Sequence, residues 1–557
     1  MKKILPLLVL FLSLKSFAQW NINTAINTPI CTEAAKQIDP RIMEDGVGGA
    51  YITWKDYRPT NALPDIYIQR IDAKGNVKWI SNGIGICTDI KDQSTPAICS
   101  DMKGGAIVAW SDWRTGIERD LYAQRIDSNG NIKWMVNGAN ISNLSNREHS
   151  EKITSDGKGG VIIAFEKQIA GVWDVWAQRL DSSGNKMWGA GGIRVCPTDT
   201  NKSKRNHRIA KDRSGGAIIS WQDNRTGADN YTNTNYDIYA QRINANGILL
   251  WGNTGKPISV GIGDQLNAKI DLDSASNGAI IAWQDTRISP DYDIYMQRID
   301  SNGNAKWTTN GIVVCNAVGN QSALDFLTID ATGEAVITWK NSRSGSEDIY
   351  AQKINSAGLS QWTANGIAIC NSTLAQINPN ICSDQNKGAI ITWQDSSATT
   401  GWDIKAQHIN NAGQALWTSN GLVVSNAIDE QNGPKNVTDN KGGTIICWQD
   451  KRTGTNDIYA HHLFSTGLFP SDVKNSISEN EMEIYPNPFS SMLDIRCSIN
   501  GLKVVTIFNL LGAQVFKSNI ENQLQLSTIN LSYLNQGVYF LKIETVEGIL
   551  TKKIIKQ

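Results

Sequence analysis

A tryptophan motif that returns about every 55 residues constrains the fold of this chain more than any other feature. The motif has the form Gly-Gly-Ala-Ile-Ile-x-Trp-x-Asp-x-Arg, and neighbouring copies lie 54 to 62 residues apart. Phenylalanine replaces the tryptophan once, so the eight positions are Trp54, Trp110, Phe165, Trp221, Trp283, Trp339, Trp393 and Trp448. An internal period of this kind predicts a repeat architecture in place of one large core.

Two further motifs keep the same period. Asp-Ile-Tyr-Ala-Gln-Arg begins at Asp65, Asp120, Asp174, Asp237, Asp293, Asp348, Asp403 and Asp457. A second tryptophan follows in seven copies, at Trp79, Trp134, Trp188, Trp251, Trp307, Trp362 and Trp417. Period-2 alternation, β-branched runs and Gly/Asn turns predict four strands per copy, the fourth carrying the second tryptophan. The fold class is therefore all-β.

Repeated four-stranded antiparallel units are typical of β-propeller blades. Eight copies predict an eight-bladed β-propeller over residues 19–464. The last copy lacks a fourth strand, and residues 20–32 resemble an isolated one. We therefore expect the N-terminal strand to complete the eighth blade and leave no open sheet edge there. The alternative is an open solenoid of sheets, which would not need a split copy.

The two ends of the chain differ from the repeats. Residues 1–18 have the pattern of a signal peptide, with Lys2 and Lys3 before a short apolar run and a cleavage site between Ala18 and Gln19. That run is too short to span a membrane. Residues 465–482 have the composition of a linker, and the short strands of residues 483–557 predict a small Ig-like β-sandwich.

Four motifs within the last 75 residues follow one another in a recognisable order: Ile-Tyr-Pro-Asn-Pro, Phe-Asn-Leu-Leu-Gly, Leu-Asn-Gln-Gly-Val-Tyr and a terminal Lys-Lys-Ile-Ile-Lys. Together they resemble the type A sorting domain of the type IX secretion system. The resemblance implies export to the cell surface or the medium, with the outer-membrane translocon and its sorting peptidase as partners. The motif residues are Tyr485, Pro486, Asn487, Pro488, Gly512, Gly537, Tyr539 and Lys553.

The sequence offers no catalytic signature. Metalloprotease, nucleophile-elbow, phosphate-loop and dinucleotide motifs are all absent from it. The chain has 53 basic and 53 acidic residues, which does not favour a nucleic-acid partner. We expect no metal, no cofactor and no membrane span. The repeated Asp and Arg of the tryptophan motif are expected to fix a loop in each blade, because a catalytic acid is normally unique.

Nine cysteines raise the question of disulfides in an exported chain. Five occupy one repeated position and are expected to be buried apolar filler: Cys31, Cys87, Cys196, Cys315 and Cys370. The alternative is that Cys87/Cys99 and Cys370/Cys382, both twelve residues apart, form bridges between strands.

Aromatic residues outside the repeat positions mark a candidate binding surface. Repeat positions account for 16 of the 19 tryptophans. The others lie in the connections between the second and third strands, as do three tyrosines. We expect them on one rim of the ring, where flat rings and polar groups suit a carbohydrate or protein ligand; they otherwise only cap the blades. The candidates are Trp113, Trp173, Trp402, Tyr57, Tyr236 and Tyr292.

Three hypotheses about function follow. The leading one is a non-enzymatic binding or scaffold module for a glycan or a surface protein. The alternative is an exported glycan-degrading enzyme, a hydrolase or lyase, which predicts unique carboxylates or a Tyr/His/Arg group near the ring axis. Glu166 and Glu347 are carboxylates that break the repeat, but the sequence gives neither a partner. The third hypothesis is a structural surface component without a ligand.

Overall fold

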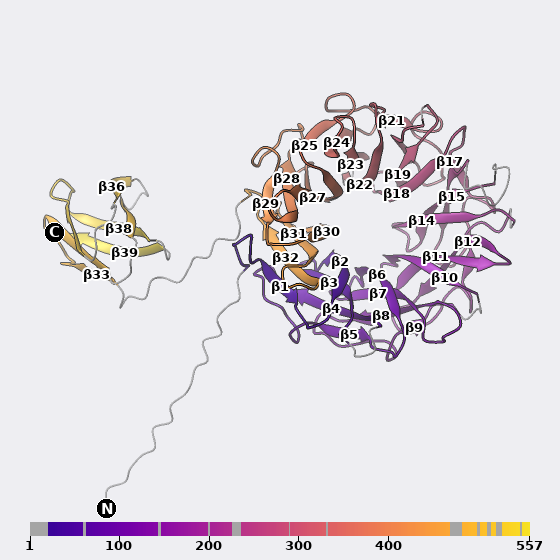
Figure 1. The fold of residues 1–557 in the computed structure, drawn as a ribbon, viewed down its shortest axis with the longest axis horizontal. Helices are drawn as coiled ribbons and strands as arrows, with labels where there is room; N and C mark the ends of the chain where they lie inside the picture. The colour runs from indigo at the N-terminus through magenta and orange to yellow at the C-terminus, as the bar shows by residue number, and fades with distance from the viewer. Residues whose placement is uncertain are drawn as a thin grey trace, which may run out of the picture. The chain divides into compact units, whose positions relative to one another are not determined.

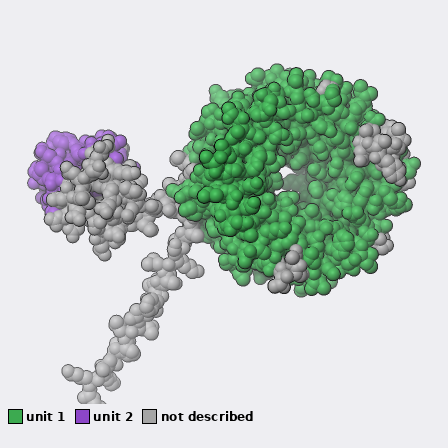
Figure 2. Space-filling view, in the orientation of Figure 1, with its two compact units in different colours: residues 1–469 green, residues 470–557 purple. Residues whose placement is uncertain are grey.

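The computed structural model describes residues 20–58, 63–142, 146–198, 201–225, 235–288, 290–329, 332–467, 482–497, 502–509, 514–519, 526–545 and 549–557. The chain divides into two compact units, residues 1–469 and 470–557 (Figure 2). The expected cleavage site at Ala18 and Gln19, most of the expected linker and Gly512 lie outside the described residues. The described residues contain no helix that is long and apolar enough to cross a membrane.

Unit 1 contains, in its described residues, eight four-stranded antiparallel sheets arranged in a ring (Figure 1). We number them as blades in chain order, and the last blade is completed by the first strand of the chain. Blades 1 to 4 comprise β2 (Gln37–Glu44), β3 (Ala50–Asp56), β4 (Asp65–Ile71), β5 (Ile84–Cys87); β6 (Gln93–Ser100), β7 (Ala106–Asp112), β8 (Asp120–Ile126), β9 (Ala139–Asn140); β10 (Glu148–Ser155), β11 (Val161–Ile169), β12 (Val172–Leu180), β13 (Ile193–Arg194); and β14 (Lys204–Lys211), β15 (Ala217–Asp223), β16 (Asp237–Ile243), β17 (Lys256–Ser259).

Blades 5 to 8 repeat the same order. They comprise β18 (Gln265–Asp273), β19 (Gly278–Asp285), β20 (Asp293–Ile299), β21 (Ile312–Cys315); β22 (Gln321–Ile329), β23 (Glu334–Asn341), β24 (Asp348–Ile354), β25 (Ile367–Cys370); β26 (Gln376–Ser383), β27 (Ala389–Ser397), β28 (Gly401–Ile409), β29 (Leu422–Ser425); and β30 (Gln431–Thr438), β31 (Thr444–Asp450), β32 (Asp457–Leu463), β1 (Thr28–Cys31). The all-β propeller prediction is confirmed.

The core of unit 1 lies between neighbouring sheets. The second strand of each blade is buried on both faces; in β7, for example, every residue is buried. Trp110 of this strand packs with Ile66 and Ile68 of the preceding blade. A tryptophan buries about 150–250 Å² of surface, which is on the order of 4–6 kcal/mol of hydrophobic stabilisation. Each blade is therefore stable only against its neighbours.

The second tryptophan of each copy lies outside the fourth strand, and the expectation that this strand carries it is wrong. Trp79 falls in the connection ahead of β5, where its backbone N–H donates to the side-chain oxygen of Gln69. Its indole Nε1 donates to the carbonyl of Ser128 in the next blade at 3.3 Å. The chain must turn at Gly83 after it, where φ is +84° and a Cβ would lie 2.6 Å from the Trp54 ring.

A β-bulge bends the innermost strand of every blade. The register slips at the same place in each, as between Ile38 and Arg41 in β2. The residue at the bulge has a left-handed backbone, with φ between +49° and +63°, in all eight blades: Asp39, Thr95, Ser150, Asn206, Asn267, Ala323, Asn378 and Gly433. Bulges change the direction of side chains. Here the residue two positions after the left-handed one points toward the ring axis, where it lines a cavity.

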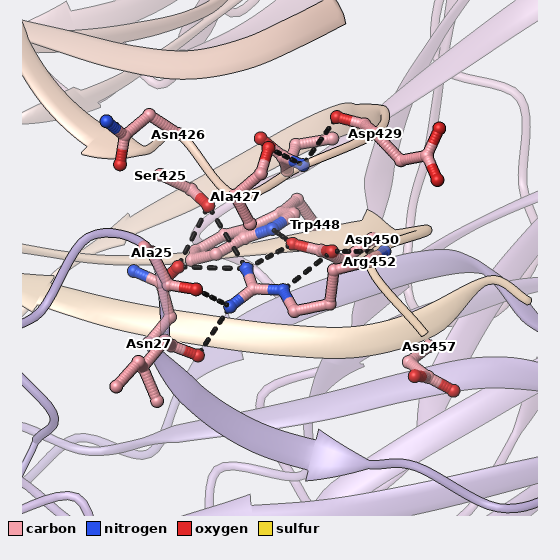
Figure 3. A network of polar contacts seen from close by, with 12 residues as sticks. Ala25, Asn27, Ser425, Asn426, Ala427, Asp429, Trp448, Asp450, Arg452 and Asp457 are labelled. Atoms are coloured by element: carbon pink, nitrogen blue, oxygen red, sulfur yellow. Dashed lines mark hydrogen bonds and ion pairs between the residues drawn. The ribbon is translucent and has the colours of Figure 1, made fainter. Parts of the chain in front are cut away.

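The two ends of the repeat region meet in blade 8. β1 pairs antiparallel with β32, with Thr28 opposite Ala460. Arg452 reinforces the junction: it donates to the carbonyl of Ala25 at 2.9 Å and to the side-chain oxygen of Asn27 at 3.0 Å while it pairs with Asp450 (Figure 3). The N-terminal strand thus completes the sheet of the last repeat, as the split copy predicts.

Unit 2 is a sandwich of two sheets over its described residues. One sheet has the order β33-β34-β37 and the other β36-β35-β38-β39. Leu493, Ile495, Val505, Ile507 and Leu541 form the centre of its core. The strands are β33 (Met482–Tyr485), β34 (Met492–Cys497), β35 (Leu502–Asn509), β36 (Gln514–Asn519), β37 (Leu526–Asn530), β38 (Gly537–Thr545) and β39 (Ile549–Lys556).

Disulfides do not contribute to the described part of the fold. Cys87, Cys99, Cys370 and Cys382 are all free thiols, so the alternative of two strand-to-strand bridges is wrong. The repeated cysteines are buried, in agreement with their expected role as small apolar filler. Burial raises the pKa of the Cys87 thiol to about 12, which keeps it protonated and unreactive.

We predict that R452A releases the N-terminal strand. The variant leaves the fully buried Asp450 without its cation, and it should lose about 3–5 kcal/mol of unfolding free energy. R287A, which breaks the equivalent pair in blade 5, is the matched control. Limited proteolysis after residue 20 should be faster for R452A alone. Equal proteolysis of both variants would show that Arg452 does not hold the junction.

We also predict that His461, in β32, makes the propeller less stable in acid. Burial lowers the pKa of this residue to about 3 from an ordinary 6.5. The unfolded chain therefore binds a proton between those values and the folded chain does not, so stability falls as the pH falls below 6.5. H461F should reduce this slope by up to about 1.4 kcal/mol per pH unit. Urea unfolding at several pH values measures it, and an unchanged slope would contradict the assignment.

Candidate functional site: a cavity beside blades 2 to 4

The repeated tryptophan motif forms joints between blades. In blade 1, the Trp54 Nε1 donates to Asp56 at 2.8 Å, and Arg58 pairs with the same carboxylate at 2.6 Å. Arg58 also lies 3.8 Å from the Tyr67 ring centre and reaches the sulfur of Cys31, which belongs to blade 8. Because this arrangement recurs around the ring, it supports the structural interpretation of the motif.

Blade 3 departs from the repeat. Lys167 stands where Asp56 stands in blade 1, and Glu148, opposite Lys167 on the neighbouring strand, stands where Gln37 stands. Their charged groups lie 2.9 Å apart with both side chains fully buried. Burial raises the pKa of Glu148, and Lys167 opposes that rise. The two substitutions therefore compensate each other.

A second cluster surrounds the buried Glu166 at the seam of blades 3 and 4. Its carboxylate accepts the backbone N–H of Asn206 at 2.6 Å and lies 3.6 Å from His207 Nδ1, 3.9 Å from His149 Nε2 and 3.6 Å from Arg205 Nε. Burial by itself raises the pKa of Glu166, but the two histidines overcome it, and the net shift is downward. Burial lowers the pKa of His149.

Aromatic and guanidinium groups cover this cluster. The ring centres of His149 and Trp173 lie 4.3 Å apart. Arg147 and Arg205 lie 5.8 Å and 5.3 Å from the centre of the Trp173 ring, within the range of cation–π attraction. Trp173 is thereby held rigidly between charged neighbours.

A cavity of about 950 Å³ opens beside these residues. Trp113, Arg119, Arg147 and His149 line one part of it. Trp113 is 37% exposed, and Arg119 lies 5.5 Å from its ring centre. Aromatic faces and fixed cations of this kind suit a polar, flat-faced ligand.

The structure brings two of the six predicted aromatics to this region. Trp113 lines the cavity and Trp173 contacts His149, which also lines it. Tyr236 is buried directly before β16 of blade 4, and Tyr57 packs against Lys36 in blade 1. Neither they nor Tyr292 of blade 5 and Trp402 of blade 7 are among the residues lining the cavity. Trp173 and Trp402 lie inside β12 and β28, so the expectation that both lie in connections between strands is wrong.

The two carboxylates that break the repeat have different surroundings. Glu166 belongs to the cluster described above, whereas Glu347 pairs only locally, with Lys340. The sequence prediction missed His149, Arg147 and Arg119. The signal was available: the innermost strand of the third copy begins Glu-His-Ser-Glu-Lys, whereas six of the other seven copies begin with glutamine and the fourth begins with lysine. The described residues hold no group of three His, Cys, Asp or Glu placed to bind a metal ion.

The C-terminal motifs interlock within unit 2. The Asn487 side chain donates to the carbonyl of Lys553 at 3.0 Å and accepts the N–H of Ile555 at 2.9 Å, which ties the Tyr-Pro-Asn-Pro motif to β39. The Tyr539 hydroxyl donates to the carbonyl of Asn535 at 2.9 Å. The side chain of Lys553 is exposed.

Residues 483–557 match a family model described as "Secretion system C-terminal sorting domain". Unit 2 is a sorting domain. The predicted resemblance is confirmed, and the chain is one that is secreted or reaches the cell surface through the type IX machinery. The sorting domain covers only the last part of the chain and does not identify the propeller.

Solved structures similar to the chain are propeller proteins of low identity. A PL25 ulvan lyase bound to a GlcA–Rha3S oligosaccharide is 11% identical, with a TM-score of 0.43 and coverage of 72% of this chain and 96% of that one. An endo-arabinase from Bacteroides thetaiotaomicron is 15% identical, with a TM-score of 0.27 and coverage of 49% and 96%. An α-L-arabinanase from Penicillium chrysogenum is 13% identical, with a TM-score of 0.33 and coverage of 60% and 97%. Among curated proteins, none matches the sequence.

The Glu148–Lys167 pair generates a stability prediction. E148Q leaves the buried Lys167 without its carboxylate and should cost about 3–5 kcal/mol of unfolding free energy. The double variant E148Q/K167M removes both charges and should recover most of that loss. Chemical unfolding of the two variants measures it. Equal stability of the single and double variants would show that the pair is not coupled.

Proposed function

We propose that the propeller is a non-enzymatic glycan-binding module, exported by the type IX route, whose site is the part of the cavity next to blades 2 to 4. One observation carries the proposal: Trp113, Arg119, Arg147 and His149 occupy positions that the repeat leaves variable, and all four line a single cavity. Residues that serve only to join blades would follow the repeat. The tyrosine and tryptophan candidates elsewhere on the rim remain predictions.

The chemistry of the cavity favours a sugar chain. The Trp113 ring offers a flat apolar face to the C–H side of a pyranose, and Arg119 and Arg147 offer donors to its oxygens. The cavity is concave and polar as well as aromatic, whereas a protein interface usually has an apolar centre.

A second candidate function rests on the Glu166 cluster. A glycan-degrading enzyme needs a group that transfers a proton, and His149, with its lowered pKa, is neutral at pH 7 and lies at the cavity wall. Arg147 beside it supplies a positive charge to a carboxylate of the substrate. This arrangement would serve a lyase better than a hydrolase, which needs a pair of carboxylates at the bond.

The export route completes the proposal. Residues 1–18 would direct the chain to the periplasm and leave at Ala18–Gln19. The translocon would then take the chain through residues 483–557, and the sorting peptidase would remove them. A surface or released module that captures polysaccharide follows from this route.

We predict that W113A weakens glycan binding by the mature chain about tenfold or more, because stacking on one aromatic face contributes about 1–2 kcal/mol. W173A should also weaken binding, because it removes the ring that packs against His149 at the cavity wall. W402A is the matched control, since Trp402 precedes Asp403 in blade 7 as Trp173 precedes Asp174 in blade 3. A glycan array identifies the ligand and calorimetry measures the affinities.

Three outcomes are distinguishable. Loss of binding in W113A and W173A with W402A unchanged supports the site. Binding by the mature chain that none of the three variants affects would place the ligand elsewhere. Release of new reducing or unsaturated ends by the mature chain, abolished in H149Q, would replace the binding module with the enzyme.

A further inference from the structure

A single structural position supplies most of the charge at the ring axis. It lies two positions after the left-handed residue of each innermost strand. Its partner on the second strand is the residue directly before the repeated tryptophan, or before Phe165 in blade 3. In chain order its occupants are Arg41, Ala97, Lys152, Arg208, Lys269, Asp325, Asn380 and Lys435. Five are cations and one is an anion.

These residues line the axial space. The cavity of about 950 Å³ includes Arg41, Lys152 and Arg208, and a second one of about 480 Å³ includes Arg41, Arg208 and Asp325. The two cavities share several axial residues and are therefore contiguous. Figure 2 shows the opening at the centre of the ring. We call the five cations the axial ring.

The axial ring is not neutralised by the protein. Lys269 lies 3.7 Å from Asp325. No ion pair of the described residues involves the other four; their side chains donate instead to backbone carbonyls nearby in sequence, for example Arg208 to His207 at 2.8 Å and Lys435 to Pro434 at 3.2 Å. The carboxylates of the cavities are engaged elsewhere: Asp39 is 3.9 Å from Lys55, and Glu151 accepts hydroxyl groups.

The cations also repel one another. Burial lowers the pKa of Lys152 to about 8; Glu151 opposes that shift, and Arg208 and Arg41 add to it. Burial also lowers the pKa of Lys435; Arg41 and Lys269 add to that shift, and Asp325 opposes it. Half-buried cations are normally paired with carboxylates. The formal net charge of the chain is zero, so a basic composition does not explain why these cations lie together.

From this arrangement we infer that the axial ring is a binding site for the acidic groups of a carboxylated or sulfated glycan. The inference deepens the proposed function and rests on it, since the same cavity holds Trp113 and His149 at its side and the axial ring at its centre. A cavity lined by one sign of charge concentrates oppositely charged ligands. Arg41 and Arg208 are suited to bidentate contacts with carboxylate or sulfate oxygens.

A chain with several charges fits better than a single anion. The cations come from five different blades, so one small ion would meet only some of them. Successive acidic sugars seated along the cavity would meet the ring while their neighbours stack beside Trp113. The opening at the centre of the ring gives such a chain a route to the axial ring.

The test uses the mature chain with polygalacturonate, dextran sulfate and carboxyl-reduced polygalacturonate, and single-stranded DNA as a polyanion that is not a glycan. We expect the mature chain to bind one or both acidic glycans, and to bind the reduced polymer and DNA at least tenfold more weakly. R41Q/R208Q should bind the acidic glycan about 100-fold more weakly than the wild type, because each lost charged contact costs about tenfold in affinity. K91Q/K306Q, which removes two exposed lysines outside the cavities, is the control and should bind normally.

Two more measurements distinguish a loss of glycan binding from a loss of folding. D325N removes the carboxylate of the axial position and should strengthen binding severalfold. R41Q/R208Q should melt at the same or a higher temperature than the wild type, since it relieves repulsion. A lower melting temperature of the double variant would instead assign the two arginines to packing.

The outcomes distinguish the inference about the axial ring from the proposed glycan site. If W113A weakens binding and R41Q/R208Q does not, or if the reduced polymer binds as well as the acidic one, the axial inference is wrong and the glycan site stands. Equal affinity for DNA would make the ring a general polyanion site and overturn the inference. If no glycan binds at all, both the inference and the proposed function are wrong.

Discussion

Packing of each sheet against the next holds the propeller together. A four-stranded blade buries its second strand on both faces only when neighbours cover it, and the tryptophan of that strand lies against the preceding blade. The polar contacts follow the same seams: Arg58 reaches Cys31 of the blade before, and the Trp79 indole reaches Ser128 of the blade after. A ring satisfies every face, whereas an open stack would leave two exposed.

Closure at blade 8 is therefore as important as any single blade. Trp20 takes the place of the second tryptophan there, donating to the Ala73 carbonyl at 3.1 Å as Trp79 donates to Ser128. Ile30 and Trp20 pack with Trp54 of blade 1 in the same kind of cluster as elsewhere. The seam between the chain's own ends is thus chemically the same as the seams between successive repeats.

The repeat explains which features of the structure can be predicted from the sequence and which cannot. The repeat, the split copy and the sorting motifs are local patterns, so the propeller, the pairing of β1 with β32 and unit 2 followed from them. The axial ring did not, because Arg41, Lys152 and Lys435 come together only through the bulge and the register of eight strands. The partnership of Glu148 with Lys167 was equally hidden, since each alone looks like a random departure from the repeat. His149 was missed because a single histidine on an innermost strand gives no local signal of the cavity that it lines.

A functional division of the molecule follows from these observations. The repeated residues hold the ring together, residues at variable positions line the cavity at its axis, and a separate sandwich directs the chain out of the cell. Charge is distributed in the same way: the Asp–Arg pairs of the seams are matched, while the cations at the axis are not.

The N-terminal strand seals the ring, and amide hydrogen exchange of β32 measures this closure. In a sealed ring β32 has a hydrogen-bonded neighbour on each side, so its amides that face β1 should exchange as slowly as those of β20 that face β21. Fast exchange along that edge of β32, with slow exchange in β20, would show that the ring is open.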